Sequence, residues 1–267
     1  MPASDALSAR VTSASLRAPL IDWPLLKRVS RSFYLTLKLL PTPVRESIAL
    51  AYLLARLSDT VVDGATNEAE KQLLARRGEI EAWLSHSPDR LEIESVWSTI
   101  RQGQRFDHER FSVNSSPLSP QELNRYTYLV AGCVGEFWTL LCQKKMPGFA
   151  ALEFSELRNL GIRFGKGLQL VNILRDRHGD ALMGRIYVPP ERFAAVLAET
   201  RAHLDDARRY VDALQVYRLR VACTLPLYLA DATLALVERY PSRERVKVSR
   251  ASVWMQLLRA LLPGKIS

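Results

Sequence analysis

Apolar residues recur along this chain with a period close to that of an α-helix that buries one face. No run of alternating apolar and polar residues is long enough to propose a sheet. The sequence therefore predicts an all-α protein. The predicted helices cover residues 24–39, 44–62, 67–84, 91–109, 120–143, 150–179, 190–198, 200–218, 220–240 and 249–261.

Two of the predicted helices carry a stripe of polar side chains on an apolar background. The first stripe consists of Tyr52, Arg56, Asp59 and Asp63. The second consists of Gln169, Asn172, Asp176 and Asp180. Residues four apart project from one face of a helix, about 6 Å apart along its axis, so each Asp-x-x-x-Asp pair presents two carboxylates together. Such stripes indicate either a binding site or exposed faces of ion pairs.

The paired carboxylates favour a metal site. Carboxylates that face a cavity have raised pKa values unless a cation joins them. Mg²⁺ takes one or two carboxylates and completes its coordination with waters and phosphate oxygens. We therefore predict that the pairs Asp59/Asp63 and Asp176/Asp180 lie across a cavity and hold Mg²⁺ against a diphosphate.

The sequence around these acids resembles the squalene/phytoene synthase family of head-to-head prenyltransferases. The resemblance rests on the blocks at residues 30–34, 53–63, 126–135, 169–176 and 184–189. It implies an isoprenoid-synthase type of helical bundle around a central cavity. It also implies a transferase that joins two allylic diphosphates through a cyclopropyl intermediate, with Mg²⁺ as cofactor.

The resemblance also implies roles for individual residues. The metal-binding positions are Asp59, Asp63, Asn172, Asp176 and Asp180. The substrate-binding positions are Ser30, Arg31, Ser32, Phe33, Tyr52, Arg56, Gln169, Asn172 and Arg175. The catalytic positions are Tyr126, Tyr128, Asp59 and Asp63. Gly179 stands where the family more usually has an acid, which affects the number of ions expected at the second pair.

Within the family the sequence favours a squalene synthase that uses two molecules of farnesyl diphosphate and reduces presqualene diphosphate with NADPH. Dehydrosqualene or phytoene synthase, which need no NADPH, is the alternative. Remote alternatives are a farnesyl diphosphate phosphatase and a non-catalytic membrane-binding helical module. The Gly165-Lys-Gly167 sequence lacks the third glycine of a Rossmann fingerprint, but squalene synthases resemble one another in having no Rossmann domain.

Length and composition are compatible with one domain. With 267 residues, 48% of them hydrophobic, the chain can bury one large core. We expect a flexible lead-in at residues 1–19, which lack the apolar core of a secretory signal, and a single domain over 20–267. Small residues at 131–135 fit either an isoprenoid chain close to the backbone or close packing of helices.

Charge and cysteine usage restrict the partners and the compartment. The net charge of +9 comes from basic residues spread along the chain rather than gathered in a tract, so nucleic acid is not expected. Diphosphates and anionic lipids suit this charge, and residues 243–262 combine a basic start with an apolar helix that can touch a membrane. Residues 221–237 approach a membrane span in length, but Pro226 and Asp231 predict a buried core helix. Three cysteines within apolar stretches predict free thiols in the cytoplasm.

Overall fold

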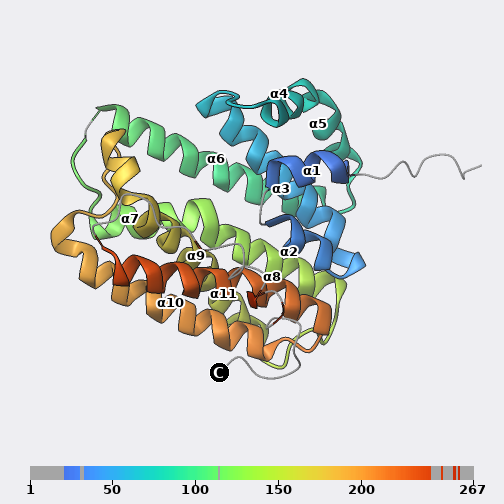
Figure 1. Cartoon of the computed structure of the whole chain (residues 1–267). Helices are drawn as coiled ribbons and strands as arrows, with labels where there is room; N and C mark the ends of the chain where they lie inside the picture. The colour runs from blue at the N-terminus through green and yellow to red at the C-terminus, as the bar shows by residue number, and fades with distance from the viewer. Residues whose placement is uncertain are drawn as a thin grey trace, which may run out of the picture.

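The computed structural model describes residues 21–30, 33–113, 115–241, 248, 255, 256 and 258, and the elements found in them are helices (Figure 1). Apart from an isolated bridge between Ala150 and Leu214, these residues form no β-structure, which confirms the all-α prediction. The elements are α1 (Trp23–Ser30), α2 (Phe33–Leu39), α3 (Thr42–Asp63), α4 (Glu68–Ala75), α5 (Arg77–His86), α6 (Arg90–Val113), α7 (Pro120–Thr127), the π-helical turn η1 (Tyr128–Gly132), α8 (Cys133–Lys145), α9 (Phe154–Leu182), the 3-10 turn η2 (Pro190–Arg192), α10 (Phe193–Ala213) and α11 (Tyr217–Arg239).

Some predictions fall outside the described residues. The lead-in at residues 1–19 lies wholly outside them. The predicted helix at 249–261 and the membrane contact at 243–262 also lie outside them, apart from the isolated positions 248, 255, 256 and 258.

Several predicted boundaries differ from those of the structure. The predicted helix 67–84 is divided at Arg76, whose φ of −98° and ψ of 13° interrupt the helical geometry between α4 and α5. The predicted helices 190–198 and 200–218 are mostly one helix, α10, because no glycine or proline interrupts residues 193–213. Helix α9 continues past Gly179, where the predicted helix 150–179 ends, and stops before Gly184, whose φ is +76°.

Helix α9 lies at the centre of the bundle. It packs against α8, α10, α11 and η1, while α3 packs against α6 on the other side of the molecule. Figure 1 shows α10 and α11 along one side and α3 and α6 along the other. In the part of the chain that the structure describes, α3 and α9 make no direct helix contact. The two helices that carry the acidic stripes are therefore separated by a space.

The contact between α8 and α9 depends on glycine. A Cβ atom on Gly135 would lie 1.9 Å from the carbonyl oxygen of Gly161, and one on Gly165 would lie 2.1 Å from that of Ala131. Only residues without a side chain allow the two backbones to approach this closely. Close helix packing therefore accounts for Gly135, one of the two explanations considered for the small residues at 131–135.

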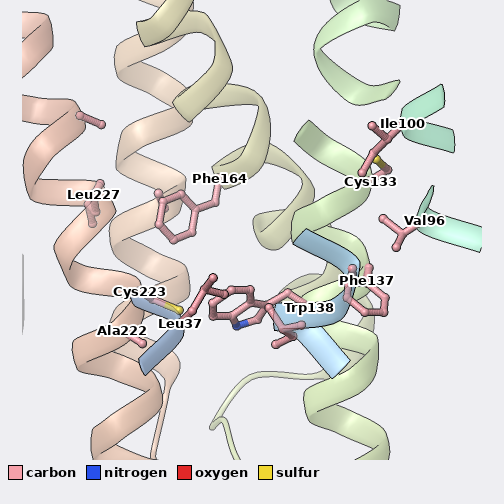
Figure 2. Close-up of a cluster of buried hydrophobic side chains, with 14 of the residues drawn as sticks. Leu37, Val96, Ile100, Cys133, Phe137, Trp138, Phe164, Ala222, Cys223 and Leu227 are labelled. Carbon is pink, nitrogen blue, oxygen red and sulfur yellow. The ribbon is translucent and has the colours of Figure 1, made fainter. Parts of the chain in front are cut away.

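Helix α11 satisfies, by length and composition, the requirements for crossing a membrane, and 56% of its apolar window is buried inside the molecule. It packs against α2, α9 and α10. Its side chains Ala222, Cys223 and Leu227 face the interior of the bundle (Figure 2). These contacts agree with the prediction of a core helix for residues 221–237.

Candidate active site

A cavity of about 520 Å³ lies between α3, α6, η1, α8, α9 and α11. Its volume is within the range of about 300–1,000 Å³ that is typical of small-molecule sites. The lining residues at one end are buried and mostly apolar, whereas those at the other end are polar and more exposed. We call these the closed end and the open end of the cavity.

The closed end is built from bulky side chains of three helices. Trp138 on α8 projects toward Phe164 on α9 and Cys223 on α11 (Figure 2). Each of these side chains is less than 9% exposed, and Trp138 Nε1 is buried without a hydrogen-bond partner. Phe33 stacks on Tyr52 with 5.4 Å between the ring centroids, and both rings line the cavity. This end offers a hydrocarbon chain an environment that excludes water.

The stripe on α3 reaches the cavity at the open end. Arg56 and Asp59 line this end, one and two helical turns along α3 from Tyr52. Arg56 Nη1 donates to Asp59 Oδ2 at 3.0 Å, and Gln104 on α6 also donates to Asp59. The Nε atom of Arg56 is buried and makes no hydrogen bond. Asp63 is the last residue of α3, and its side chain lies outside the described residues.

The stripe on α9 divides into two parts. Gln169 and Asn172 line the cavity. Asp176, further along the helix, accepts a hydrogen bond of 2.8 Å from Arg175 Nε, and neither residue lines the cavity. Burial and the nearby Asp176 raise the pKa of Asp180 to about 6. Ionised Asp180 is therefore unfavourable unless a cation comes close to it.

The two predicted catalytic tyrosines have different surroundings. Tyr126 is buried and lines the cavity, and burial raises the pKa of its phenol well above its usual value. Tyr128 is exposed and donates a hydrogen bond of 2.7 Å to Glu136. Residues two apart on a helix project in nearly opposite directions, so only one of the pair faces the cavity. The structure brings Tyr126 and not Tyr128 to the candidate site.

The predicted substrate-binding residues near the start of the chain are only partly described. Phe33 lines the cavity. The hydroxyl of Ser30 is buried and donates to the carbonyl oxygen of Leu26 at 2.5 Å, so it caps its own helix rather than facing the cavity. Arg31 and Ser32 lie outside the described residues.

Sequence reasoning missed a buried polar cluster beside Asp180. Tyr187 donates a hydrogen bond of 2.6 Å to Asp107 Oδ1, and Arg185 Nη1 lies 3.5 Å from Asp107 Oδ2. The ring of Tyr187 stacks on that of Tyr126, with 5.2 Å between the ring centroids. Helix α6 gave little signal for Asp107 because polar residues occur on all its faces. Arg185 and Tyr187 lie in the block at 184–189, but no role had been assigned to them.

The carboxylates fit a magnesium ion that is shared with a phosphate group. Among the described residues, no three acids, histidines or cysteines come together as a metal site of their own. Mg²⁺ does not require such a cage, because one or two carboxylates suffice when phosphate oxygens and waters complete its coordination. Asp59 on α3 and Asp176 and Asp180 on α9 carry hard oxygen atoms of this kind, and of the three only Asp59 lines the cavity.

Comparison with known proteins identifies the family of this chain. Residues 26–196 match the model of the squalene/phytoene synthase family. The chain belongs to the squalene/phytoene synthase family. A squalene synthase from Schizosaccharomyces pombe is 24% identical to it over 90% of this chain and 64% of its own length. A phytoene synthase from Arthrospira platensis is 30% identical over 73% of this chain and 70% of its own length.

The fold is shared with a solved member of the family. A ligand complex of TcSQS superimposes with a TM-score of 0.76 at 20% identity, covering 90% of this chain and 85% of that one. This likeness confirms the predicted isoprenoid-synthase type of bundle. The chain spans between 33% and 64% of the length of four of the curated family members that it matches.

Proposed function

We propose that this protein joins two molecules of farnesyl diphosphate head to head and forms squalene with NADPH as reductant. The observation that carries the proposal is a single cavity with an apolar closed end and an acidic open end that receives polar residues from both α3 and α9. Family membership supports prenyl transfer. The S. pombe squalene synthase, which aligns with 90% of this chain, supports the choice of product.

The open end would bind and activate the diphosphate. Mg²⁺ would be held by Asp59 and Asp63 on α3 and by Asn172, Asp176 and Asp180 on α9. When bound, Mg²⁺ stabilises the charge that develops on the departing diphosphate. Arg56 lines the same end, and its buried, unpaired Nε atom is a donor available to a phosphate oxygen. Arg175 and the amide of Gln169 lie on the opposite helix and would complete the binding of the diphosphate.

The closed end would protect the carbocation from water. The stacked rings of Phe33 and Tyr52 and the ring of Phe164 line the cavity. Aromatic faces attract cations in a site from which water is excluded. The same walls hold the two isoprenoid chains side by side, which brings the reacting carbons together without a loss of entropy during the reaction.

Tyr126 would take part in the removal of the proton that closes the cyclopropane ring. Because burial raises its pKa, the phenol stays protonated at neutral pH. Tyr126 can therefore accept the proton of the substrate only if it passes its own proton to a neighbouring group at the same time. Its ring stacks on that of Tyr187, whose hydroxyl donates to the Asp107 carboxylate. The proton would thus pass through Tyr126 and Tyr187 to Asp107.

We further propose that residues 20–267 form one domain, and that the protein is cytoplasmic and associates peripherally with membranes. The three buried free thiols support a reducing compartment. Squalene partitions into lipid, so release beside a membrane would favour product departure.

The proposal is tested by incubating the purified protein with farnesyl diphosphate and Mg²⁺, with and without NADPH, and identifying the products by mass spectrometry. Squalene formed only with NADPH is the expected result. A conjugated triene formed regardless of NADPH would indicate dehydrosqualene synthase, and turnover only with the C20 diphosphate would indicate phytoene synthase. Release of farnesol alone would indicate a phosphatase, and absence of any turnover would contradict an enzymatic role.

A further inference from the structure

A second cavity of about 470 Å³ lies between α3, α5 and α6. It shares the side chains of Val62, Gln104 and His108 with the open end of the main cavity. Gln104 donates a hydrogen bond to Asp59, so the wall between the two cavities is directly attached to the predicted metal-binding stripe. The proposed prenyl transfer takes place in the main cavity and gives this second cavity no function.

The walls of the second cavity are basic. Arg101, Arg105 and His108 recur at helical spacing along one face of α6, and Arg77 reaches the same cavity from α5. The lining includes three arginines and one acid, Glu81, which pairs with Arg77 at 2.8 Å. We call the surface formed by Arg77, Arg101, Arg105 and His108 the basic groove.

Two guanidinium groups of the basic groove are available to a ligand. In the part of the chain that the structure describes, neither Arg101 nor Arg105 forms an ion pair or hydrogen bond with another side chain. The guanidinium of Arg101 lies over the ring of Trp97, 4.4 Å from its centroid. Trp97 is itself fixed, because its Nε1 donates to Ser58 at 2.7 Å. The stacking restricts the orientation of Arg101 and leaves its N–H groups unused.

These properties fit a diphosphate group. Arginine binds phosphate oxygens through two parallel hydrogen bonds, and a cluster of unpaired cations in a recess concentrates anions. The main cavity differs in this respect, because the two arginines that line it, Arg56 and Arg185, pair with the carboxylates of Asp59 and Asp107. The basic groove offers an anion positive charge that requires no metal.

We propose that the basic groove is a second binding site for a diphosphate group, next to the site of prenyl transfer. Two sources supply this chemistry, and naming them rests on the proposed function. One is the inorganic diphosphate that prenyl transfer releases, which would move past Gln104 and His108 into the groove. The other is the diphosphate bridge of the nicotinamide dinucleotide. The wall shared by the two cavities places either source beside the reacting centre.

The test is calorimetric titration of the full chain with sodium diphosphate at low ionic strength and without divalent cations. The variant Arg101→Gln/Arg105→Gln should bind at least tenfold more weakly than the wild type. The matched control is Arg201→Gln/Arg209→Gln, which removes the same charge from exposed positions on α10 and should change the affinity less than twofold. The variant Arg101→Lys/Arg105→Lys keeps the charge but not the paired N–H groups, and should have intermediate affinity.

A parallel titration with NADP⁺ distinguishes the two sources. Binding of NADP⁺ at least tenfold tighter than inorganic diphosphate, lost in the same glutamine variant, would assign the groove to the dinucleotide; equal or weaker binding would assign it to the released product. Equal diphosphate affinity in the wild type and the glutamine variant would overturn the proposal. So would an equal loss in the α10 control, or no binding of either ligand at millimolar concentration. These titrations need no turnover, so they remain informative even if prenyl transfer is not observed.

Discussion

The two ends of the main cavity are made in different ways. Trp138, Phe164 and Cys223 at the closed end are almost completely buried, and helix packing alone determines their positions. In the acidic stripes, Asp59 is 37% exposed, whereas burial, reinforced by the nearby Asp176, raises the pKa of Asp180 to about 6. The closed end is therefore determined by packing, whereas the acidic stripes include a carboxylate, Asp180, whose ionised form is unfavourable unless a cation comes close. A protein accumulates such unfavourable charge mainly where function requires it.

The largest expected effect comes from removing carboxylates of the two acidic stripes. Asp59→Asn or Asp176→Asn should each lower the Mg²⁺-dependent turnover of farnesyl diphosphate by about 10³-fold. Each variant removes a proposed ligand of the Mg²⁺ ion, whose charge would stabilise the leaving diphosphate. Helicity measured by circular dichroism should not change. Asp205→Asn on α10, at a side chain that is 71% exposed, is the control and should keep full activity. Normal turnover in both site variants would exclude the proposed role of the acids.

A second effect concerns the close contact between α8 and α9, which both line the main cavity. Gly135→Ala places a methyl group against the carbonyl oxygen of Gly161, so α8 and α9 must move apart. We expect the free energy of unfolding to fall by about 1–3 kcal/mol, measured by urea denaturation. Gly78→Ala in α5 adds the same methyl group where nothing lies within 4 Å, and should leave stability unchanged or raise it slightly. Equal stability of both variants would show that α8 and α9 do not pack as described.

A third effect tests whether the closed end limits chain length. Trp138→Leu would shorten the side chain that projects between Phe164 and Cys223, and so deepen the apolar end. The kcat/KM for the C20 diphosphate relative to the C15 diphosphate should rise about tenfold, which corresponds to burial of about two additional methylene groups. Phe137→Leu is the control, because Phe137 is buried on the same helix but does not line the cavity. A similar rise in both variants would indicate general loosening of the core.

The smallest effect is on stability at low pH near the start of α7. Glu122 pairs with Arg110 and closes a capping box with Ser119, and these contacts, above all the one with Arg110, lower its pKa to about 2. A carboxylate whose pKa is lowered by folding stabilises the protein above its unfolded pKa of about 4.5, and this contribution is lost as the pH falls toward 2. Glu122→Gln should therefore cost about 1 kcal/mol or less at pH 7 and nothing near pH 2.

Thermal unfolding of both proteins across this pH range measures the difference. Ser119→Ala removes the other half of the capping box and should have a similar cost at pH 7. A stability difference for Glu122→Gln that stays constant from pH 7 to pH 2 would contradict the assigned cause of the pKa shift.

The sequence predicted features that depend on neighbouring residues better than features that depend on contacts between distant parts of the chain. Helical periodicity identified α3 and α9 because their polar stripes stand out against apolar residues. The capping box at Ser119 likewise depends only on residues that are neighbours in the sequence. Both signals are local, and the structure retains them.

Features that depend on distant parts of the chain were not predictable in this way. Asp107 contacts Tyr187 and Arg185, which lie far along the sequence, and its own helix is polar on several faces. Periodicity could not decide between Tyr126 and Tyr128, because only the packing of η1 against α9 determines which of them is buried. The basic groove likewise requires α5 and α6 to be brought together.

The central claim is that the acids of α3 and α9 act on one diphosphate through shared metal ions. The most direct test is a crystal structure with Mn²⁺ in place of Mg²⁺ and a non-hydrolysable thio-analogue of farnesyl diphosphate. We predict anomalous peaks at the open end of the cavity, within coordination distance of Asp59 on one side and of Asp176 or Asp180 on the other. Peaks confined to the outer surface, or an analogue bound with no metal between the two helices, would contradict the claim.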